Sequence, residues 1–182
     1  MSTHSETPVK PTPEMMEWID SSWGVNDEGV LIWIRDGQTR NIKSGDPLYC
    51  GLQSNGYMIC RTSTKLRRAI KVHHLVWYFI TGEWPALSID HIDGNRTNNS
   101  FSNLRLATKG QNMRNRKPTK GRDLPKGVNK AYKEKYNAAI SAGNQRIYLG
   151  YFNSPEEAEE AYKMASLKLH QEFSTYALQE VI

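Results

Sequence analysis

The sequence has few cysteines and no long apolar run, and each absence excludes a class of protein. Only Cys50 and Cys60 occur in 182 residues, too few for a disulfide framework or a four-cysteine zinc site. No apolar stretch approaches the roughly 18 residues that cross a bilayer, so a membrane span is excluded. Residues 1–20 lack a basic region followed by an apolar stretch, so they do not form a secretory signal. Together these absences predict an intracellular protein.

Charge is distributed unevenly along the chain. The formal net charge is only +5, with 24 Lys and Arg against 19 Asp and Glu. Residues 105–135, however, hold eleven basic and two acidic residues, a net of +9. Residues 153–182 hold two basic residues and six glutamates, a net of −4. A concentrated cationic stretch suits a protein that follows nucleic-acid phosphates, although a solvated linker can have the same composition.

The N-terminal half is predicted to form a small antiparallel sheet and a buried helix. Residues 1–22 are rich in Ser, Thr, Pro and Glu, which predicts a disordered segment with a short helix near residues 15–19. Three apolar stretches separated by glycine-containing turns then predict the sheet. These stretches are residues 30–34, 47–50 and 57–60. The dense apolar segment at residues 73–80 favours a short buried helix.

The C-terminal part is predicted to be three strands followed by one helix. The polar run at 115–125 contains two prolines, a glycine and four basic residues, a composition typical of an extended linker. Strand-like stretches follow at residues 127–131, 136–142 and 146–151. Ser154, Pro155 and Glu157 then form a helix-start signal, a serine cap with proline and glutamate in the first turn.

Most of the chemical information lies in residues 88–115. Two apolar residues flank Asp90 and His91, a loop of Asp, Gly and Asn follows, and residues 104–107 return as a second strand. Thr108 and Gln111 then form a capping box that opens a helix carrying Asn112. A strand, loop, strand and helix in this order can bring Asp90, His91 and Asn112 around one point. Carboxylate and carboxamide oxygens suit one Mg²⁺ or Mn²⁺ ion, and a neighbouring histidine can act as a general base.

Two other interpretations of this loop compete with a metal site. An EF-hand beginning at Asp93 requires glycine at its sixth position and glutamate at its twelfth, where this chain has Asn98 and Leu104. The calcium-loop interpretation is therefore excluded. The second interpretation, a polar turn beside a hydrogen-bonded buried His91, stays open on the residues alone.

Residues 23–115 closely resemble the HNH endonucleases carried by phages, many of which are homing endonucleases. The residues that carry the resemblance are His73, Asp90-His91, Asn98-Asn99, Asn103-Leu104-Arg105, Thr108 and Gln111-Asn112. The resemblance implies a ββα-metal motif in which Asp90 and Asn112 bind the metal. It also implies that His91 activates the attacking water and that Asn103 holds the loop so that His91 is correctly aimed. His73 is a further candidate for a catalytic or phosphate-contacting role.

Residues 126–182 resemble the ethylene-response-factor (AP-two) DNA-binding domain. The matching pieces are Gly127-Val128, residues 136–140, 148–152, 156–158 and Ala161-Tyr162. In that family a three-stranded sheet enters the major groove and a helix packs behind it. This sequence departs from the plant pattern at Asn129, Ala131, Ser141 and Tyr136. Phosphate contacts are still expected, but the plant target sequence does not carry over.

Together these features predict an α+β protein. It consists of a disordered segment (1–22), an HNH nuclease domain (23–115) with a small antiparallel sheet and the ββα-metal motif, a basic linker (116–125) and an AP-two-type domain (126–182). The residues expected to contact DNA are Arg105, Arg114, Arg116, Lys117, Lys120, Arg122, Lys126, Asn129, Lys130, Lys133, Lys135, Arg146 and Tyr148.

The predicted function is a metal-dependent endonuclease that binds double-stranded DNA and leaves a 3′-hydroxyl and a 5′-phosphate. We expect one divalent ion per site, a monomer, no membrane partner, and action in the cytoplasm of a host cell. The alternative is a non-cleaving DNA-binding or regulatory protein built on an HNH scaffold.

Overall fold

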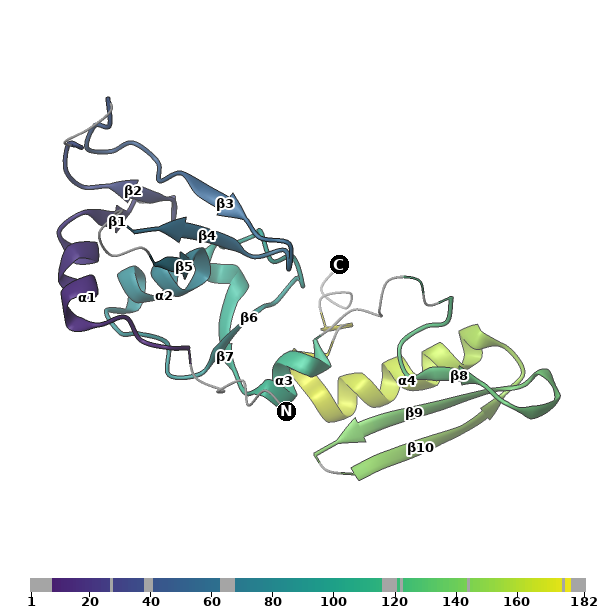
Figure 1. Cartoon of the computed structure of the whole chain (residues 1–182). Helices are drawn as coiled ribbons and strands as arrows, with labels where there is room; N and C mark the ends of the chain where they lie inside the picture. The colour runs from purple at the N-terminus through teal and green to yellow at the C-terminus, as the bar shows by residue number, and fades with distance from the viewer. Residues whose placement is uncertain are drawn as a thin grey trace. The chain divides into compact units, whose positions relative to one another are not determined.

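The computed structural model divides the chain into two compact units, Met1–Thr108 and Lys109–Ile182 (Figure 1). It describes residues 8–26, 28–37, 41–62, 68–115, 121, 123–143, 145–174 and 176–177. The architecture is mixed α+β with small antiparallel sheets, as predicted. The division falls after Thr108, whereas the sequence placed the end of the first domain at residue 115. None of the helices in the described part of the chain has the length and apolar character that a bilayer crossing requires.

The first unit is built from short elements in three antiparallel sheets (Figure 1). Strands β1 and β2 form one pair, β3, β4 and β5 form a three-stranded sheet in that order, and β6 pairs with β7. The elements are α1 (Pro13–Asp20), β1 (Trp23–Val25), β2 (Leu31–Trp33), β3 (Cys50–Leu52), β4 (Met58–Arg61), β5 (Ala69–Lys71), α2 (Val72–Thr81), β6 (Ser88–His91), the 3₁₀ turn η1 (Phe101–Asn103) and β7 (Leu104–Ala107).

Helix α1 extends the short helix predicted near residues 15–19 and corrects the disorder predicted around it. Thr12 caps the helix by accepting a hydrogen bond from the Met15 amide at 3.4 Å, and a proline occupies the first turn. Met15 and Ile19, four residues apart, share one helix face and are buried in the core of the unit. The polar composition predicted that apolar burial would be too small to offset the conformational entropy lost on folding. Burial of these two side chains offsets that loss. Residues 1–7 lie outside the described part.

Helix α2 is the centre of the first unit and confirms the helix predicted at residues 73–80. Leu75 and Val76 are fully buried in a core that also contains Trp23, Ile89 and Leu104. The helix ends at Gly82, whose φ of 77° is a left-handed conformation that glycine adopts without strain. Because α2 touches β1, β2, β4, β5 and η1, it joins the separate small sheets into one unit.

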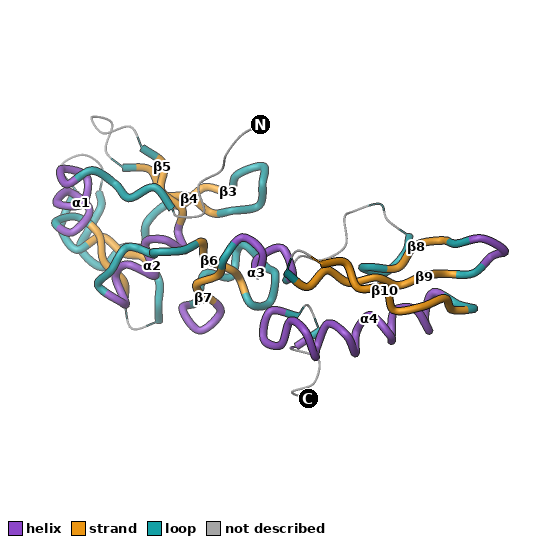
Figure 2. The backbone as a smooth tube through the Cα atoms, turned by 90° about the horizontal axis from the view of Figure 1, so that it is seen from below, coloured by secondary structure: helices purple, strands orange, loops and turns teal. Residues whose placement is uncertain are grey.

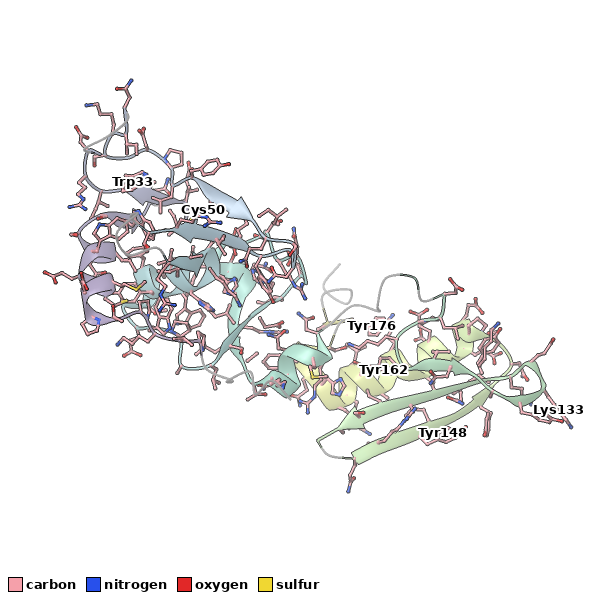
Figure 3. All side chains as sticks on the ribbon, in the orientation of Figure 1. Trp33, Cys50, Lys133, Tyr148, Tyr162 and Tyr176 are labelled. Atoms are coloured by element: carbon pink, nitrogen blue, oxygen red, sulfur yellow. A yellow bond between two sulfur atoms is a disulfide. The ribbon has the colours of Figure 1, made fainter. Side chains whose placement is uncertain are left out.

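The two cysteines pair with each other across the β3–β4 ladder. Cys50 and Cys60 are directly opposite in register, with Cα atoms 4.5 Å apart, and form a disulfide (Figure 3 labels Cys50). One bridge is not the disulfide framework that the cysteine count excluded. It does link two of the short strands of the first unit.

The second unit is one three-stranded sheet covered on one face by a long helix (Figure 2). Its antiparallel strands run in the order β10, β9, β8, and the helix is α4. The three strands and the helix predicted for this part are confirmed. The elements are α3 (Lys109–Arg114), β8 (Val128–Lys130), the 3₁₀ turn η2 (Tyr132–Glu134), β9 (Tyr136–Ala142), β10 (Gln145–Phe152), α4 (Pro155–His170) and the 3₁₀ turn η3 (Gln171–Phe173).

Small residues let α4 lie close to the sheet. Ser154 caps the helix by accepting from the Glu157 amide at 3.2 Å, as the capping signal predicted. Ala158 and Tyr162 then pack against Val128, Ala138 and Ile140 in the core of this unit. At Gly127, φ is 78° and an added Cβ would meet the Tyr162 ring at 2.1 Å, so only glycine fits at the start of β8.

Candidate active site

The β6–β7 hairpin places a buried ion pair at the predicted metal position. Asp90 on β6 lies directly opposite Arg105 on β7. The Arg105 Nε and Nη2 atoms both donate to Asp90 Oδ2, at 3.0 and 2.8 Å. The Asp90 side chain is 4% exposed, so this charge partner partly compensates the cost of burying the carboxylate. Arg105, which the sequence assigned to DNA, therefore sits on the predicted metal ligand.

His91, the next residue on β6, is buried and held in one orientation. Its Nε2 lies 3.2 Å from Asn99 Oδ1, while Asn99 Nδ2 donates to the Thr97 carbonyl at 3.1 Å. The second bond assigns the Asn99 oxygen to the His91 side, and an oxygen can only accept. In neutral His91, Nε2 therefore carries the hydrogen and Nδ1 carries the basic lone pair. Burial lowers the pKa of His91, and the Asn99 hydrogen bond opposes this shift only partly, which favours the neutral base.

Asn103 braces the loop between the two strands. Its Nδ2 donates to Asp93 Oδ1 at 3.0 Å and to the Asn98 carbonyl at 2.8 Å, and its Oδ1 accepts from the Asp93 amide at 3.0 Å. Burial opposes ionisation of Asp93, but hydrogen bonds from Asn98, the Asn95 amide and Asn103 outweigh it and lower the pKa of Asp93. Asn103 thus acts on the loop, whereas the direct contact to His91 is made by Asn99, a role the sequence did not assign.

The ring of His91 packs in a cluster with the rings of His73 and Tyr57. The ring of His73, on α2, lies 5.0 Å from the His91 ring and 5.2 Å from the Tyr57 ring, measured between centroids. His73 is 2% exposed, and its Nδ1 has no hydrogen-bond partner among the described residues. Burial, reinforced by His74, His91 and Lys71, holds the pKa of His73 far below its ordinary value, so its imidazole is neutral. His73 therefore contacts the candidate base through its ring.

Two cations that the sequence did not single out as site residues also reach this cluster. Lys71 Nζ lies 4.7 Å, and Arg96 Cζ 4.8 Å, from the centroid of the Tyr57 ring. Arg96 lies within the Asp-, Gly- and Asn-rich loop after His91, and Lys71 stands two residues before His73. Their closeness in sequence to the motif could have marked Lys71 and Arg96 as candidate site residues. Their contact with the Tyr57 ring, however, depends on the pairing of β4 with β5.

The side chains predicted to bind a metal, a carboxylate and a carboxamide, are of the chemical type that binds a hard divalent ion. A carboxylate and a carboxamide supply oxygen ligands of the type that Mg²⁺ and Mn²⁺ prefer. Asp90 lies on β6 in the first unit and Asn112 on α3 in the second, so their meeting at one ion stays a prediction. The described residues contain no gathering of three His, Cys, Asp or Glu side chains of the kind that builds a zinc centre.

The second unit exposes several of the residues predicted to contact DNA. Tyr148 and Tyr151 are 52% and 66% exposed on β10, with ring centroids 5.5 Å apart (Figure 3 labels Tyr148). Their neighbours Ile147 and Phe152 pack into the core, so by strand alternation the tyrosines point to the face away from α4. Asn129 is on the same face, where its Nδ2 donates to Asn137 Oδ1 at 3.4 Å. Also exposed are Lys130, Lys133, Lys135 and Arg146.

Two further predicted cations line one cavity of the second unit, together with Arg146. Arg114, Lys126 and Arg146 border a cavity of about 480 Å³, together with Ser141 and His170. The Lys126 ammonium donates to the Arg114 carbonyl, which ties the chain before β8 to α3. The predicted residues Arg116, Lys117, Lys120 and Arg122 lie outside the described residues.

Comparison with known proteins identifies the motif. Residues 71–114, which hold α2, the β6–β7 hairpin and α3, match the family model described as HNH endonuclease. The chain carries an HNH endonuclease domain. The match contains Lys71, His73, Asp90, His91 and Arg96.

The HNH domain has viral and phage relatives. The chain is 30% identical over 124 residues to an uncharacterised HNH endonuclease of Acanthamoeba polyphaga mimivirus, covering 68% of this chain and 63% of the relative. It is 34% identical over 102 residues to the DNA endonuclease I-HmuI of Bacillus phage SP01, covering 55% of this chain and 57% of the relative. The chain thus spans about 60% of the relatives it matches. A solved structure of the HNH homing endonuclease I-HmuI aligns with a TM-score of 0.41 and 21% identity over 82% of this chain and 86% of that one.

Proposed function

We propose that this protein is a DNA endonuclease that hydrolyses phosphodiester bonds at its HNH domain and leaves a 3′-hydroxyl and a 5′-phosphate. The observation that carries the proposal is the geometry of His91. It is buried beside Asp90, its Nε2 is bound to Asn99, and its pKa is lowered by burial. A neutral histidine fixed in one tautomer is suited to remove a proton at neutral pH.

In this mechanism His91 is the general base. Nδ1 takes a proton from a water molecule as that water attacks phosphorus, and the bond from phosphorus to the 3′ oxygen breaks. The leaving oxygen is protonated from solvent, so the products are a 3′-hydroxyl and a 5′-phosphate. Asn99 orients the imidazole, and Asn103 keeps the loop that carries Asn99 in place. His73 supports the His91 ring by contact.

We also propose that Asp90 and Asn112 hold one Mg²⁺ or Mn²⁺ ion. When bound, such an ion supplies charge neutralisation at the phosphate and at the leaving oxygen. Arg105 pairs with Asp90 and limits the cost of keeping that carboxylate ionised and buried.

The second unit is proposed to bind double-stranded DNA as an AP-two-type module through the sheet face opposite α4. That face presents Tyr148, Tyr151, Asn129 and Arg146, while the glutamates of α4 belong to the covering helix. Cations meet phosphates and the polar side chains face the bases. Two DNA-binding units in one chain give avidity without a second subunit, so we propose a monomer.

The direct test is cleavage of supercoiled plasmid in Mg²⁺ by the wild type and by His91→Ala. We expect the wild type to convert the supercoiled form and His91→Ala to lose at least about a hundredfold in rate, the contribution typical of a positioned general base. His4→Ala, which also removes one histidine, is the matched control and should cut as the wild type does. Added imidazole should partly restore His91→Ala, because it replaces the base without changing the fold.

Two outcomes would decide against the proposal. If the wild type binds duplex DNA but leaves plasmid intact across salt, sequence and Mg²⁺ or Mn²⁺, the non-cleaving alternative is correct. If His91→Ala cuts as fast as the wild type, His91 is not the base.

A further inference from the structure

Two positive side chains converge on one aromatic ring in the first unit. Lys71 ends strand β5, Arg96 lies in the loop after β6, and Tyr57 precedes β4. The ammonium and guanidinium groups lie 4.7 and 4.8 Å from the Tyr57 ring centroid, within the range of cation–π attraction. The ring therefore gathers two cations from segments that are far apart in the sequence.

These two cations repel each other and have no acidic partner among the described residues. The side-chain ion pairs of that part are Lys43 with Asp36 and Arg105 with Asp90. Arg96 donates through Nη1 to the Asn55 carbonyl at 2.6 Å, which fixes its position without neutralising its charge. Lys71 is half-buried, and its pKa is lowered by that burial and by Arg96. A partly buried cation beside a like charge is costly, and a bound anion would offset that cost.

The aromatic ring that holds both cations lies beside the proposed general base. The Tyr57 ring is 6.0 Å from the His91 ring and 5.2 Å from the His73 ring, between centroids. An anion held by both cations would therefore lie next to His91.

We propose that Lys71 and Arg96, held on the ring of Tyr57, bind a phosphate of the DNA strand that is cut. The proposal rests on the proposed endonuclease function and adds the residues that hold the substrate at His91. Arg96 offers a planar set of donors suited to two phosphate oxygens, and Lys71 offers a point charge. Tyr57 is a positioning residue, because it touches the cations rather than the phosphate.

The test is the salt dependence of binding to a labelled DNA duplex, measured by fluorescence anisotropy in EDTA so that no cleavage occurs. For Lys71→Gln and Arg96→Gln, we expect the slope of log affinity against log salt to fall by about 0.9 for each phosphate that the variant no longer neutralises. The affinity at low salt should fall severalfold. Lys71→Arg keeps the charge and should retain the wild-type slope.

The matched control is Arg35→Gln, which removes an exposed cation from the same unit and should leave slope and affinity unchanged. A second series separates a positioning role of the ring from a folding role. Tyr57→Phe keeps the ring and should keep the slope, whereas Tyr57→Leu should lower it at an unchanged melting temperature. In Mg²⁺, Lys71→Gln and Arg96→Gln should raise KM for DNA.

The outcomes separate this proposal from the proposed function. If the wild type cuts DNA and both Gln variants keep its slope and its KM, the phosphate site is wrong and the endonuclease stands. If the wild type neither binds nor cuts duplex DNA, both proposals fall. A Tyr57→Leu protein that is folded and keeps the full slope would also overturn the role given to the ring.

Discussion

At the residue scale, burial controls ionisation around the candidate base. His73, His74 and His91 each have a lowered pKa, and burial is the largest cause in each case. For His74, burial and the nearby Lys71 lower the pKa to about 3. The folded unit thus holds its imidazoles neutral at pH values where an unfolded chain would protonate them.

This difference predicts a loss of stability on mild acidification. The unfolded chain binds a proton at His74 below its ordinary pKa, and the folded chain does not until the pH nears 3, so stability falls as the pH decreases through that window. The free energy of unfolding should fall by up to about 1.4 kcal/mol per pH unit for each such histidine. His74→Phe should remove the contribution of His74 to this pH dependence. The effect is measured between about pH 6.5 and 5, where most carboxylates are still ionised. Urea unfolding at several pH values measures this, and an identical slope in both proteins would contradict it.

At the element scale, the first unit depends on very short strands. Strands β1, β2, β3 and β5 have three residues each, so each contributes few ladder hydrogen bonds. These strands are stabilised by packing against α2, by pairing with neighbouring strands and by the Cys50–Cys60 disulfide between β3 and β4. Strand β4 begins one residue after Tyr57, so the disulfide also steadies the element next to the cation-binding ring.

Breaking this disulfide should destabilise the first unit selectively. Cys50 and Cys60 are separated by 10 residues, and a loop of that length is worth about 2 to 3 kcal/mol in chain entropy. A strong reductant should lower the melting transition of the first unit and leave that of the second unaffected. A protein with Cys50→Ala and Cys60→Ala should melt at the reduced value and no longer respond to reductant. If the reductant does not shift the wild type, the disulfide does not stabilise the fold.

At the scale of the whole molecule, the proposed general base and the proposed DNA-reading face belong to different units. Asp90, His91 and the Lys71–Arg96 pair lie in the first unit, while the exposed face around Tyr148 lies in the second. The net charge of +9 over residues 105–135 begins in β7 and continues through β8 to the start of β9. This division predicts that binding and cleavage can be changed separately.

Substitution of both exposed tyrosines should weaken DNA binding without slowing the chemical step. For the double variant Tyr148→Ala, Tyr151→Ala we expect KM to rise about tenfold, a loss of about 1.4 kcal/mol, with kcat near the wild-type value. Met164→Ala is the matched control, because Met164 is 62% exposed on the covering helix α4. A proportionate fall in kcat, or an equal effect in the control, would contradict a role for this sheet face.

The sequence predicted those helices and strands that are specified by neighbouring residues, such as helix caps and the spacing of apolar side chains. Helix α4 was predicted from its Ser154 cap and the spacing of its small apolar residues. Strands β6 and β7 were predicted from apolar residues on either side of a polar loop. Helix α1 is longer than predicted because two buried side chains, Met15 and Ile19, suffice to order a segment of otherwise polar composition. Strands β1 and β5 were not predicted, since three residues carry almost no periodicity and form only when a partner strand is present.

The sequence by itself determined which chemistry is proposed for this protein. The types and order of Asp90, His91 and Asn112 predicted a base beside hard oxygen donors, and the resemblance to HNH endonucleases added the loop-holding role expected of Asn103. Tertiary structure alone decided which groups surround the candidate base, His91. Asn99 meets His91 through the shape of the loop, and Lys71 and Arg96 meet on Tyr57 because β5 pairs with β4. Contacts between such distant segments depend on packing, which no local pattern records.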